Sequence, residues 1–139
     1  MSADGKPLYV SMPIRVKTYD IDFVGHVNNI VYIRWLEDLR LLLLDTYSPL
    51  EDMRKAGYVP IIVNTEIHYK QGIVLSDHEV EAEMWAGEPG SASIFLEAQF
   101  KVGGEVRATA RQRGTFVDSN TMKIIRVPDD FRRHMDGLR

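Results

Sequence analysis

The chain has 139 residues, a formal net charge of −3 and no cysteine. A chain of this length is most simply one domain, residues 1–139, which can bury a core without a disulfide or a metal ion. The lack of cysteine excludes disulfides, thiolate catalysis and zinc–cysteine sites, and the mild charge, with no uniform basic face, gives no sign of nucleic-acid binding.

The sequence has no recognisable targeting or membrane-anchoring segment. Residues 1–7 are polar and contain no apolar signal core. The longest uninterrupted apolar run, residues 41–44, is far shorter than a membrane span. We therefore expect a cytoplasmic protein that does not associate with membranes.

The first predicted element is a strand over residues 8–16. Apolar residues alternate there with polar ones at a period of two, which is typical of a half-buried strand. Pro13 cannot donate a hydrogen bond to a neighbouring strand, so it indicates an edge strand or a bulge.

The second predicted element is a long helix over residues 30–47. Asn28 or Asn29 is its expected N-cap, and Ser48-Pro49 ends it. Apolar residues cover most of its surface, so we expect other structure to wrap around it. Residues 50–57 follow as a short helix or turn, which Gly57 stops.

The rest of the chain is predicted to be mostly strand. Gly103-Gly104 is a two-residue hairpin signal between two alternating segments. A short helix is expected near the C-terminus, over residues 128–135. The predicted strands cover residues 61–69, 80–86, 94–102 and 106–116.

This order of elements predicts an α+β fold, in which a five-stranded antiparallel sheet curls around one long central helix. The last four strands are expected to follow one another largely through hairpin-like links. Such a sheet keeps two free edges, and long exposed edges favour pairing with another chain. We therefore expect a dimer or a higher homo-oligomer.

The chemically richest segment is residues 19–29, which join the first strand to the long helix. Asp22 lies where the positive end of a helix dipole favours an anion, and its carboxylate can attack a carbonyl carbon or deprotonate a water molecule. The Asn29 N–H in the first helical turn can bind the carbonyl oxygen as charge develops on it, and Gly25 permits close approach. His26 can orient the carbonyl or hold Asp22.

The same residues also have simpler interpretations. Aspartate and asparagine before a helix are commonly caps, and a single loop histidine is usually only hydrogen-bonded. Asp20 fits a structural turn better than a second acid. Glu37, further along the helix, fits a solvated or ion-paired side chain better than a general base.

No metal site or cofactor is expected. Asp20, Asp22 and Gly25 imitate the start of a calcium loop, but Val24 and Val31 occupy its required fifth and twelfth positions. His68 and His78 have no metal-ligand spacing to His26, and the chain has neither a Walker motif nor a dinucleotide fingerprint.

Residues 20–29, followed by Tyr32 and residues 35–40, resemble the hotdog-fold thioesterases of the 4-hydroxybenzoyl-CoA thioesterase family. The segment is similar to that of bacterial long-chain acyl-CoA thioesterases and of plant fatty acyl-carrier-protein thioesterases. The detailed motif covers the first third of the chain, whereas the order of elements matches over nearly all of it. The resemblance implies hydrolysis of an acyl thioester to a free acid and a thiol.

The resemblance also implies roles for individual residues. Asp22 falls on the family's catalytic aspartate, and Asn29 on the position whose backbone N–H polarises the thioester carbonyl. His26 matches the histidine of the His-Val-Asn-Asn subgroup. Val24 stands where the plant enzymes have an asparagine, which argues against a plant-type catalytic network.

The family's active sites form at a dimer interface, so the resemblance implies that the partner's strand, residues 61–69, lines the pocket. Lys70, Arg111 or Arg113 could contact the phosphates of coenzyme A, although each also fits an exposed strand charge. Tyr32 fits packing at least as well as contact with the acyl group. The candidate substrate-binding residues are Gly25, Tyr32, Thr65, Lys70 and Arg111.

Two other functions remain open on the same fold. One is a module that binds an acyl thioester or lipid without hydrolysing it. The other is a hydratase or dehydratase, although the Asp22-x-x-x-His26 pattern is not that subgroup's usual signature. The sequence leaves open coenzyme A or acyl-carrier protein as the thiol carrier, and a homodimer or a homotetramer.

Overall fold

The computed structural model describes residues 5–137, so residues 1–4 of the predicted polar N-terminal segment lie outside it. Its main layer is one antiparallel sheet with the strand order β1-β3-β4-β5-β2, and a short sixth strand, β6, pairs with β5. The strands are β1 (Val10–Arg15), β2 (Tyr58–Tyr69), β3 (Glu79–Ala86), β4 (Ser93–Val102), β5 (Glu105–Asp118) and β6 (Ile124–Ile125).

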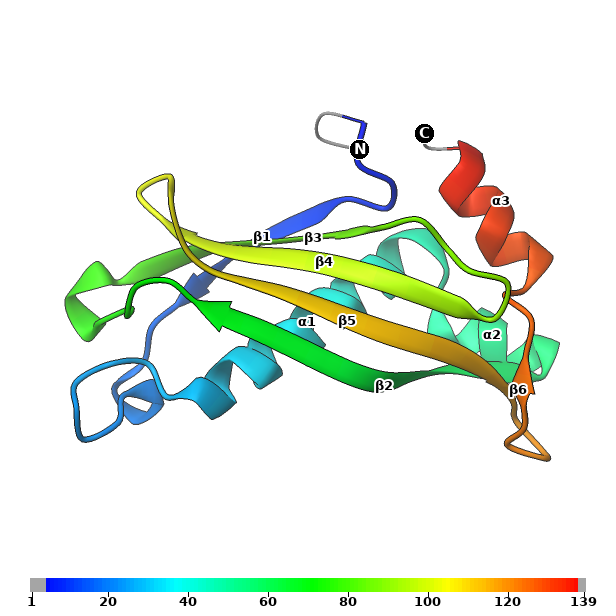
Figure 1. Ribbon diagram of the computed structural model, residues 1–139, viewed down its shortest axis with the longest axis horizontal. Coiled ribbons are helices and arrows are strands. Elements are labelled where there is room, and N and C mark those ends of the chain that lie inside the picture. Colours follow the sequence, from blue (N-terminus) through cyan, green and yellow to red (C-terminus); the bar gives the residue numbers. More distant parts are fainter. Residues whose placement is uncertain (1–4, 138–139) are drawn as a thin grey trace.

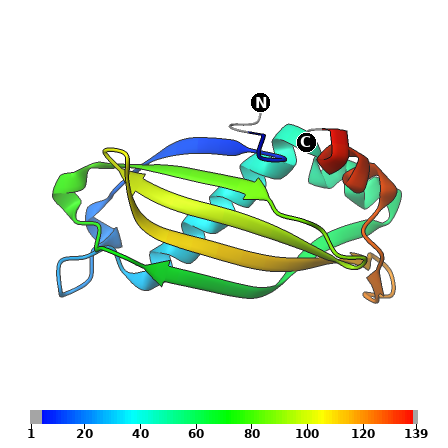
Figure 2. The ribbon, with the colours of Figure 1, turned by 45° about the horizontal axis from the view of Figure 1, so that its top comes forward.

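The long helix α1 (Asn29–Tyr47) lies across one face of this sheet (Figure 1; Figure 2). Two shorter helices, α2 (Leu50–Ala56) and α3 (Asp129–Gly137), lie at the end of the sheet where α1 finishes (Figure 1). The predicted fold, an antiparallel sheet around a central helix, is therefore confirmed. The sequence analysis did not predict β6.

One stripe of α1 is buried against the sheet. Asn28 caps the helix, because its Oδ1 accepts a hydrogen bond of 3.0 Å from the Ile30 N–H. The opposite side of the helix remains open, and Ile33 is 45% exposed. The prediction that other structure wraps around α1 therefore holds for the side that faces the sheet, and the opposite side is uncovered in the single chain. The buried residues are Val31, Tyr32, Trp35, Leu36, Leu39 and Leu43.

An aromatic cluster fixes the N-terminal half of α1 on the sheet. The Tyr32 ring packs edge-on against Trp35 at 5.2 Å, Tyr69 at 5.1 Å and Phe100 at 5.4 Å between centroids. Edge-to-face aromatic pairs contribute about 0.5–1.5 kcal/mol each beyond their buried area. The cluster therefore holds the helix N-terminus in a defined position over the end of β2.

Glycines occupy the predicted turns in which the backbone is left-handed. Gly103 and Gly104 have φ values of +57° and +82°, as a two-residue hairpin between β4 and β5 requires. Gly57, at φ +93°, ends α2 in the left-handed conformation. Pro13 lies in β1, which is an edge strand as predicted.

The link from β2 to β3 corrects one expectation. These strands are not neighbours, because β2 forms one edge of the sheet while β3 pairs with β1 and β4. Residues 70–78 therefore form a crossover at the end of the sheet, and they include a single 3₁₀ turn, Leu75–Asp77. A hairpin was expected here because these two strands follow one another in the sequence. The alternation of apolar and polar residues does not show which strands pair.

A buried acid links the first strands of the sheet. Glu83, only 6% exposed, accepts hydrogen bonds from the Tyr9 hydroxyl and from Gln99 Nε2, the latter at 2.8 Å. It also pairs with Lys101 Nζ at 2.9 Å. Burial alone would raise the pKa of Glu83, but the bonds from Tyr9, Lys101 and Gln99 and the charge of Lys101 outweigh it. Together they hold the pKa below its usual 4.5.

This lowered pKa predicts a loss of stability in acid. The folded state favours ionised Glu83, so its contribution is present above pH 4.5 and is lost as the pH falls through the folded-state pKa. Urea unfolding of the wild type and Glu83→Gln should give a free-energy difference that shrinks between about pH 6 and pH 3. A difference that stays constant over this range would contradict the assignment.

Candidate active site

The loop before α1 holds the Asp22 carboxylate in one orientation. Asp22 Oδ1 accepts hydrogen bonds from the Val24 N–H at 2.9 Å and the His26 N–H at 3.2 Å. The Asp22 N–H donates to the His26 carbonyl, and the Gly25 N–H donates to the Asp22 carbonyl. Gly25 has φ +92°, a conformation that favours glycine. Asp22 Oδ2 has no hydrogen-bond partner within residues 5–137, so one oxygen of the carboxylate is free.

The preceding acid has a structural role. Asp20 is buried, and its Oδ2 accepts a 2.9 Å hydrogen bond from the Lys17 N–H, which closes the 3₁₀ turn Thr18–Asp20. Its carbonyl accepts the Asn28 N–H at 2.8 Å. Asp20 thus ties the loop to the start of α1, as expected for a turn residue.

The first turn of α1 presents a free backbone donor. The Asn28 side chain and carbonyl satisfy the N–H groups of Ile30 and Val31. The Asn29 N–H has no partner among the described residues. A free N–H at a helix N-terminus binds anionic or polarised oxygen, because the helix dipole adds to the hydrogen bond.

A hollow of about 180 Å³ lies beside this helix terminus. Four of the predicted residues line it, namely His26, Asn29, Tyr32 and Lys70. Asp22 and Gly25 do not line it, although they lie in the same loop as His26. The remaining lining residues are Val27, Tyr69, Gln71 and Gly72.

The hollow is closed on one side by a contact that sequence reasoning missed. The imidazole of His26 lies so close to Gly72 that a Cβ at residue 72 would be 2.9 Å from ring atoms Cγ and Nδ1. The two residues are far apart in sequence, so only the crossover of residues 70–78 brings them together. The only sign of this contact in the sequence is a glycine in that link, and a glycine alone does not indicate which residue lies against it.

Tyr32 serves as a wall of the hollow rather than as an acid. Burial raises its pKa to about 12, and the neighbouring Tyr69 adds to the shift while Arg107 opposes it. The phenol therefore stays protonated at neutral pH. The Tyr69 hydroxyl reaches the Asn29 carbonyl at 3.4 Å, so the end of β2 also supports the helix terminus.

Thr65 and Arg111 do not line this hollow. Thr65 lies on the edge strand β2, where its Oγ1 accepts a 3.0 Å hydrogen bond from Gln112 Nε2. Arg111 pairs with Glu97 at 3.0 Å and stacks over the Phe95 ring at 4.4 Å. Arg111 lines a separate depression on the sheet, so any contact with a ligand in the His26 hollow would require a long reach.

Two further cavities lie nearer the other end of α1. One, of about 130 Å³, is partly enclosed between α1 and the sheet and is mostly lined by leucine and isoleucine, including Leu41, Leu44 and Ile94. Its polar rim carries Arg40, which donates to buried Gln112 at 3.1 Å and pairs with Glu37. The other is an open groove of about 680 Å³ among α1, α2 and α3.

Residues 5–137 contain neither a metal cluster nor a membrane-spanning helix. No three His, Asp or Glu side chains gather there in a way that could hold a metal ion. No helix in this part of the chain is long and apolar enough to cross a membrane.

An antiparallel sheet around one long helix, with an acid–histidine loop at the amino end of that helix, defines a hotdog-fold protein. The chain belongs to the thioesterase-like superfamily, whose family model matches residues 16–135. The predicted family and fold are thereby confirmed.

Individual relatives agree with this assignment. The chain is 28% identical over 130 residues to the long-chain acyl-CoA thioesterase FadM of Escherichia coli strain K12, covering 90% of this chain and 96% of that protein. It resembles the structure of YbaW, a probable thioesterase from Escherichia coli, with 25% identity and a TM-score of 0.83 over 92% and 97% of the two chains. A thioesterase from Thermus thermophilus, solved with coenzyme A and zinc, shares the fold at 24% identity and a TM-score of 0.81, covering 98% and 96%.

Proposed function

We propose that this protein hydrolyses acyl-CoA thioesters to a free acid and coenzyme A. The observation that carries the proposal is the hollow at the N-terminus of α1, where His26 and Asn29 meet beside the loop of Asp22. Membership of the thioesterase-like superfamily supports it. The similarity to a long-chain acyl-CoA thioesterase favours coenzyme A over acyl-carrier protein as the thiol carrier.

Asp22 is the proposed reacting group, and two routes are open to its free oxygen. As a nucleophile, Oδ2 bonds to the thioester carbon and the C–S bond breaks, so that coenzyme A leaves as a thiolate, which takes a proton from solvent water. A water molecule then hydrolyses the acyl–aspartyl anhydride to the free acid and regenerates the Asp22 carboxylate. As a general base, the carboxylate takes a proton from a water molecule, whose oxygen bonds to the carbon; the same C–S bond then breaks, and Asp22 passes the proton to the leaving thiolate.

The backbone around Asp22 supports either route. In both, negative charge develops on the carbonyl oxygen, and the unpaired Asn29 N–H is the proposed donor to it. Gly25, in the same loop, would permit close approach of the substrate, and the imidazole of His26 would orient the carbonyl. Lys70, which lines the same hollow, is the better positioned of the candidate phosphate contacts, and Arg111 would require a partner chain or a long reach.

The partly enclosed apolar cavity beside Leu41 is the proposed site for the distal part of the acyl group. Leu41 follows Asn29 by 12 residues, so an acyl chain whose carbonyl lies at Asn29 must extend about 18 Å along α1 to reach it. An apolar cavity of about 150 Å³ holds a benzene ring, so 130 Å³ suits the end of an alkyl chain. Long acyl chains should therefore be preferred to short or aromatic ones.

A thiol-release assay on acetyl-, octanoyl-, palmitoyl- and benzoyl-CoA tests the proposal. We expect thiol release from the acyl-CoAs, with kcat/KM rising about fourfold for each methylene that enters the cavity, because burying one contributes about 0.8 kcal/mol. Tight binding without thiol release would favour a lipid-binding module instead. Equal turnover of acetyl- and palmitoyl-CoA would refute the role of the cavity.

The proposed assembly is a homo-oligomer in which a second copy covers the open side of α1. Apolar residues follow this side and the adjacent edge strand, although they face solvent in the single chain: Ile30, Ile33 and Leu41 on α1 with Val63 and Tyr69 on β2. Exposed apolar residues on a helix and on the edge strand β2 favour self-association. In such an assembly, Thr65 on β2 would belong to a partner's pocket.

A further inference from the structure

The reason for a glycine at residue 72 lies in a neighbouring side chain and not in its own backbone conformation. The φ of Gly72 is not positive, so any residue could adopt its conformation. What excludes a side chain is the imidazole of His26, whose Cγ, Nδ1 and Cδ2 would lie 2.9–3.0 Å from an added Cβ. Real Cβ atoms do not approach other atoms so closely, so a side chain here would push the ring aside. The position of Gly72 therefore limits where the His26 ring can lie.

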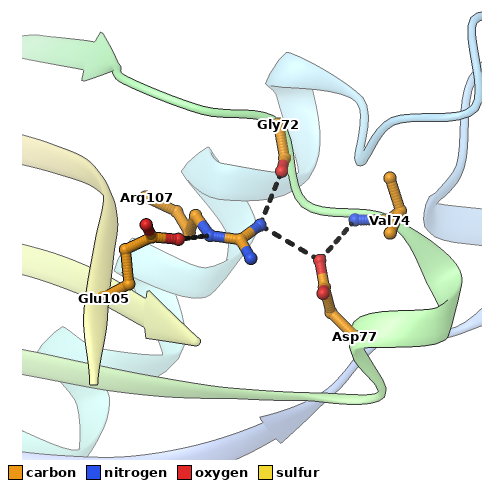
Figure 3. Close-up of polar contacts among 5 residues, drawn as sticks. All are labelled: Gly72, Val74, Asp77, Glu105 and Arg107. Atoms are coloured by element: carbon orange, nitrogen blue, oxygen red, sulfur yellow. Dashed lines mark hydrogen bonds and ion pairs between the residues drawn. The ribbon is translucent and has the colours of Figure 1, made fainter. Parts of the chain in front are cut away.

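The Arg107 guanidinium fixes the position of Gly72 (Figure 3). Its Nη1 donates to the Gly72 carbonyl at 2.7 Å and to Asp77 Oδ2 at 3.1 Å, and its Nε donates to Glu105 at 2.8 Å. Asp77 Oδ2 also accepts the Val74 N–H at 2.9 Å. The side chain of Arg107 is only 11% exposed and that of Asp77 17%, so the bond between them is largely shielded from water, whereas Glu105 is 59% exposed.

The backbone of Arg107 holds the same crossover. Its carbonyl accepts the N–H groups of Lys70 at 2.9 Å and Gln71 at 3.1 Å. The crossover is tied in turn to the loop before α1, because the Val27 N–H donates to the Ile73 carbonyl at 2.8 Å. Arg107 thus holds both ends of residues 70–77, and Gly72 in that segment lies against the His26 ring.

We propose that Arg107 is a positioning residue for thioester hydrolysis, which sets the orientation of the His26 imidazole through the Gly72 peptide. This inference rests on the proposed function, in which His26 orients the substrate carbonyl. Loss of the guanidinium would free the Gly72 carbonyl and let the crossover move away from the ring. The planar fork of arginine matters, since lysine cannot hold the carbonyl and both carboxylates in one geometry.

The first test replaces Gly72 with alanine and reads His26 directly. The imidazole NMR signals of His26 should shift, whereas those of His68, His78 and His134 should stay in place. Gly87→Ala is the matched control, because its φ is also not positive and its added Cβ would meet nothing closer than 3.5 Å. Unmoved His26 signals in Gly72→Ala would overturn the proposal.

The second test is kinetic. We expect Gly72→Ala to lower kcat by about 10–10²-fold with little change in KM, because a misplacement of about 1 Å can cost 10²-fold in rate. In a His26→Ala background the same substitution should have no further effect on kcat. An equal loss of kcat in both backgrounds would show that Gly72 does not act through the imidazole, and would overturn the proposal.

The third test addresses Arg107 itself. Arg107→Gln should reproduce the His26 NMR shift and the kcat loss of Gly72→Ala, and Arg107→Lys should fall between it and the wild type. A folded Arg107→Gln protein with unchanged His26 signals would refute the role of the guanidinium. Failure of the proposed function gives a different result, since neither the wild type nor any variant would then release thiol, while the NMR shifts would remain.

Discussion

Replacing Asp22 with asparagine is expected to lower kcat for thiol release by about 10²–10⁴-fold, the range that a positioned proton-transfer group contributes. The amide oxygen of asparagine can still accept the N–H groups of Val24 and His26, so the loop should keep its shape. What is lost is the negative charge on the free oxygen, which the two proposed routes use either as a nucleophile or as a general base. Steady-state thiol release from palmitoyl-CoA measures the effect.

The matched control for this variant is Asp45→Asn. Asp45 is an exposed aspartate on α1, remote in sequence from the loop, so its loss should leave turnover unchanged. Urea unfolding should give nearly the same free energy for both variants. Wild-type turnover in a folded Asp22→Asn protein would remove the carboxylate from the mechanism.

The second large effect is expected for Ile33→Glu, which should dissociate the assembly into monomers of 15.9 kDa. Ile33 is 45% exposed on the open side of α1, within the proposed interface. Burying an unpaired carboxylate costs several kcal/mol, and a two-fold interface would bury two of them. The dissociation constant should rise at least about 10³-fold, and thiol release should fall with the dimer fraction.

Sedimentation velocity over a range of protein concentrations measures this change. Ile124→Glu is the control, because Ile124 is 62% exposed on β6, away from α1, and glutamate there should alter neither mass nor turnover. A wild-type protein that sediments as a monomer at micromolar concentration would contradict the proposed assembly. So would an Ile33→Glu variant that keeps the wild-type mass.

Much of the fold could be predicted because its signals are local. The long helix and its cap at Asn28 follow from a polar capping residue placed directly before an apolar segment. Gly103 and Gly104 mark a hairpin because few other residues adopt positive φ twice in succession. Pro13 predicts an edge strand because it lacks an N–H.

Strand pairing could not be predicted in the same way. β2 pairs with β5 and β3 with β1, and both pairings join segments distant in sequence. The alternation of apolar and polar residues says which face of a strand is buried, but not which strand lies beside it. The crossover of residues 70–78 was missed for this reason. The strand β6 was missed because its two residues, Ile124–Ile125, are too few to show an alternating pattern.

The residues of the candidate site fall into the same two groups, those contiguous in sequence and those brought together only by the fold. The residues of the loop and the first helical turn, Asp22 to Asn29, could be proposed from sequence because they are contiguous. The support from Gly72 and Arg107 could not, because it depends on the crossover. The predicted strand over residues 106–116 contains Arg107, but the strand pattern does not show that its side chain is only 11% exposed and holds two carboxylates and a carbonyl.

The most direct test of the proposed chemistry is a crystal structure with an acyl-CoA analogue in which a methylene group replaces the thioester sulfur. The analogue keeps the carbonyl but cannot release a thiol. We predict that its carbonyl oxygen lies about 2.7–3.1 Å from the Asn29 nitrogen, with an oxygen of Asp22 about 3–3.5 Å from the carbonyl carbon. A carbonyl bound in the groove among α1, α2 and α3, or an Asp22 carboxylate turned away from the bound carbonyl, would contradict the mechanism.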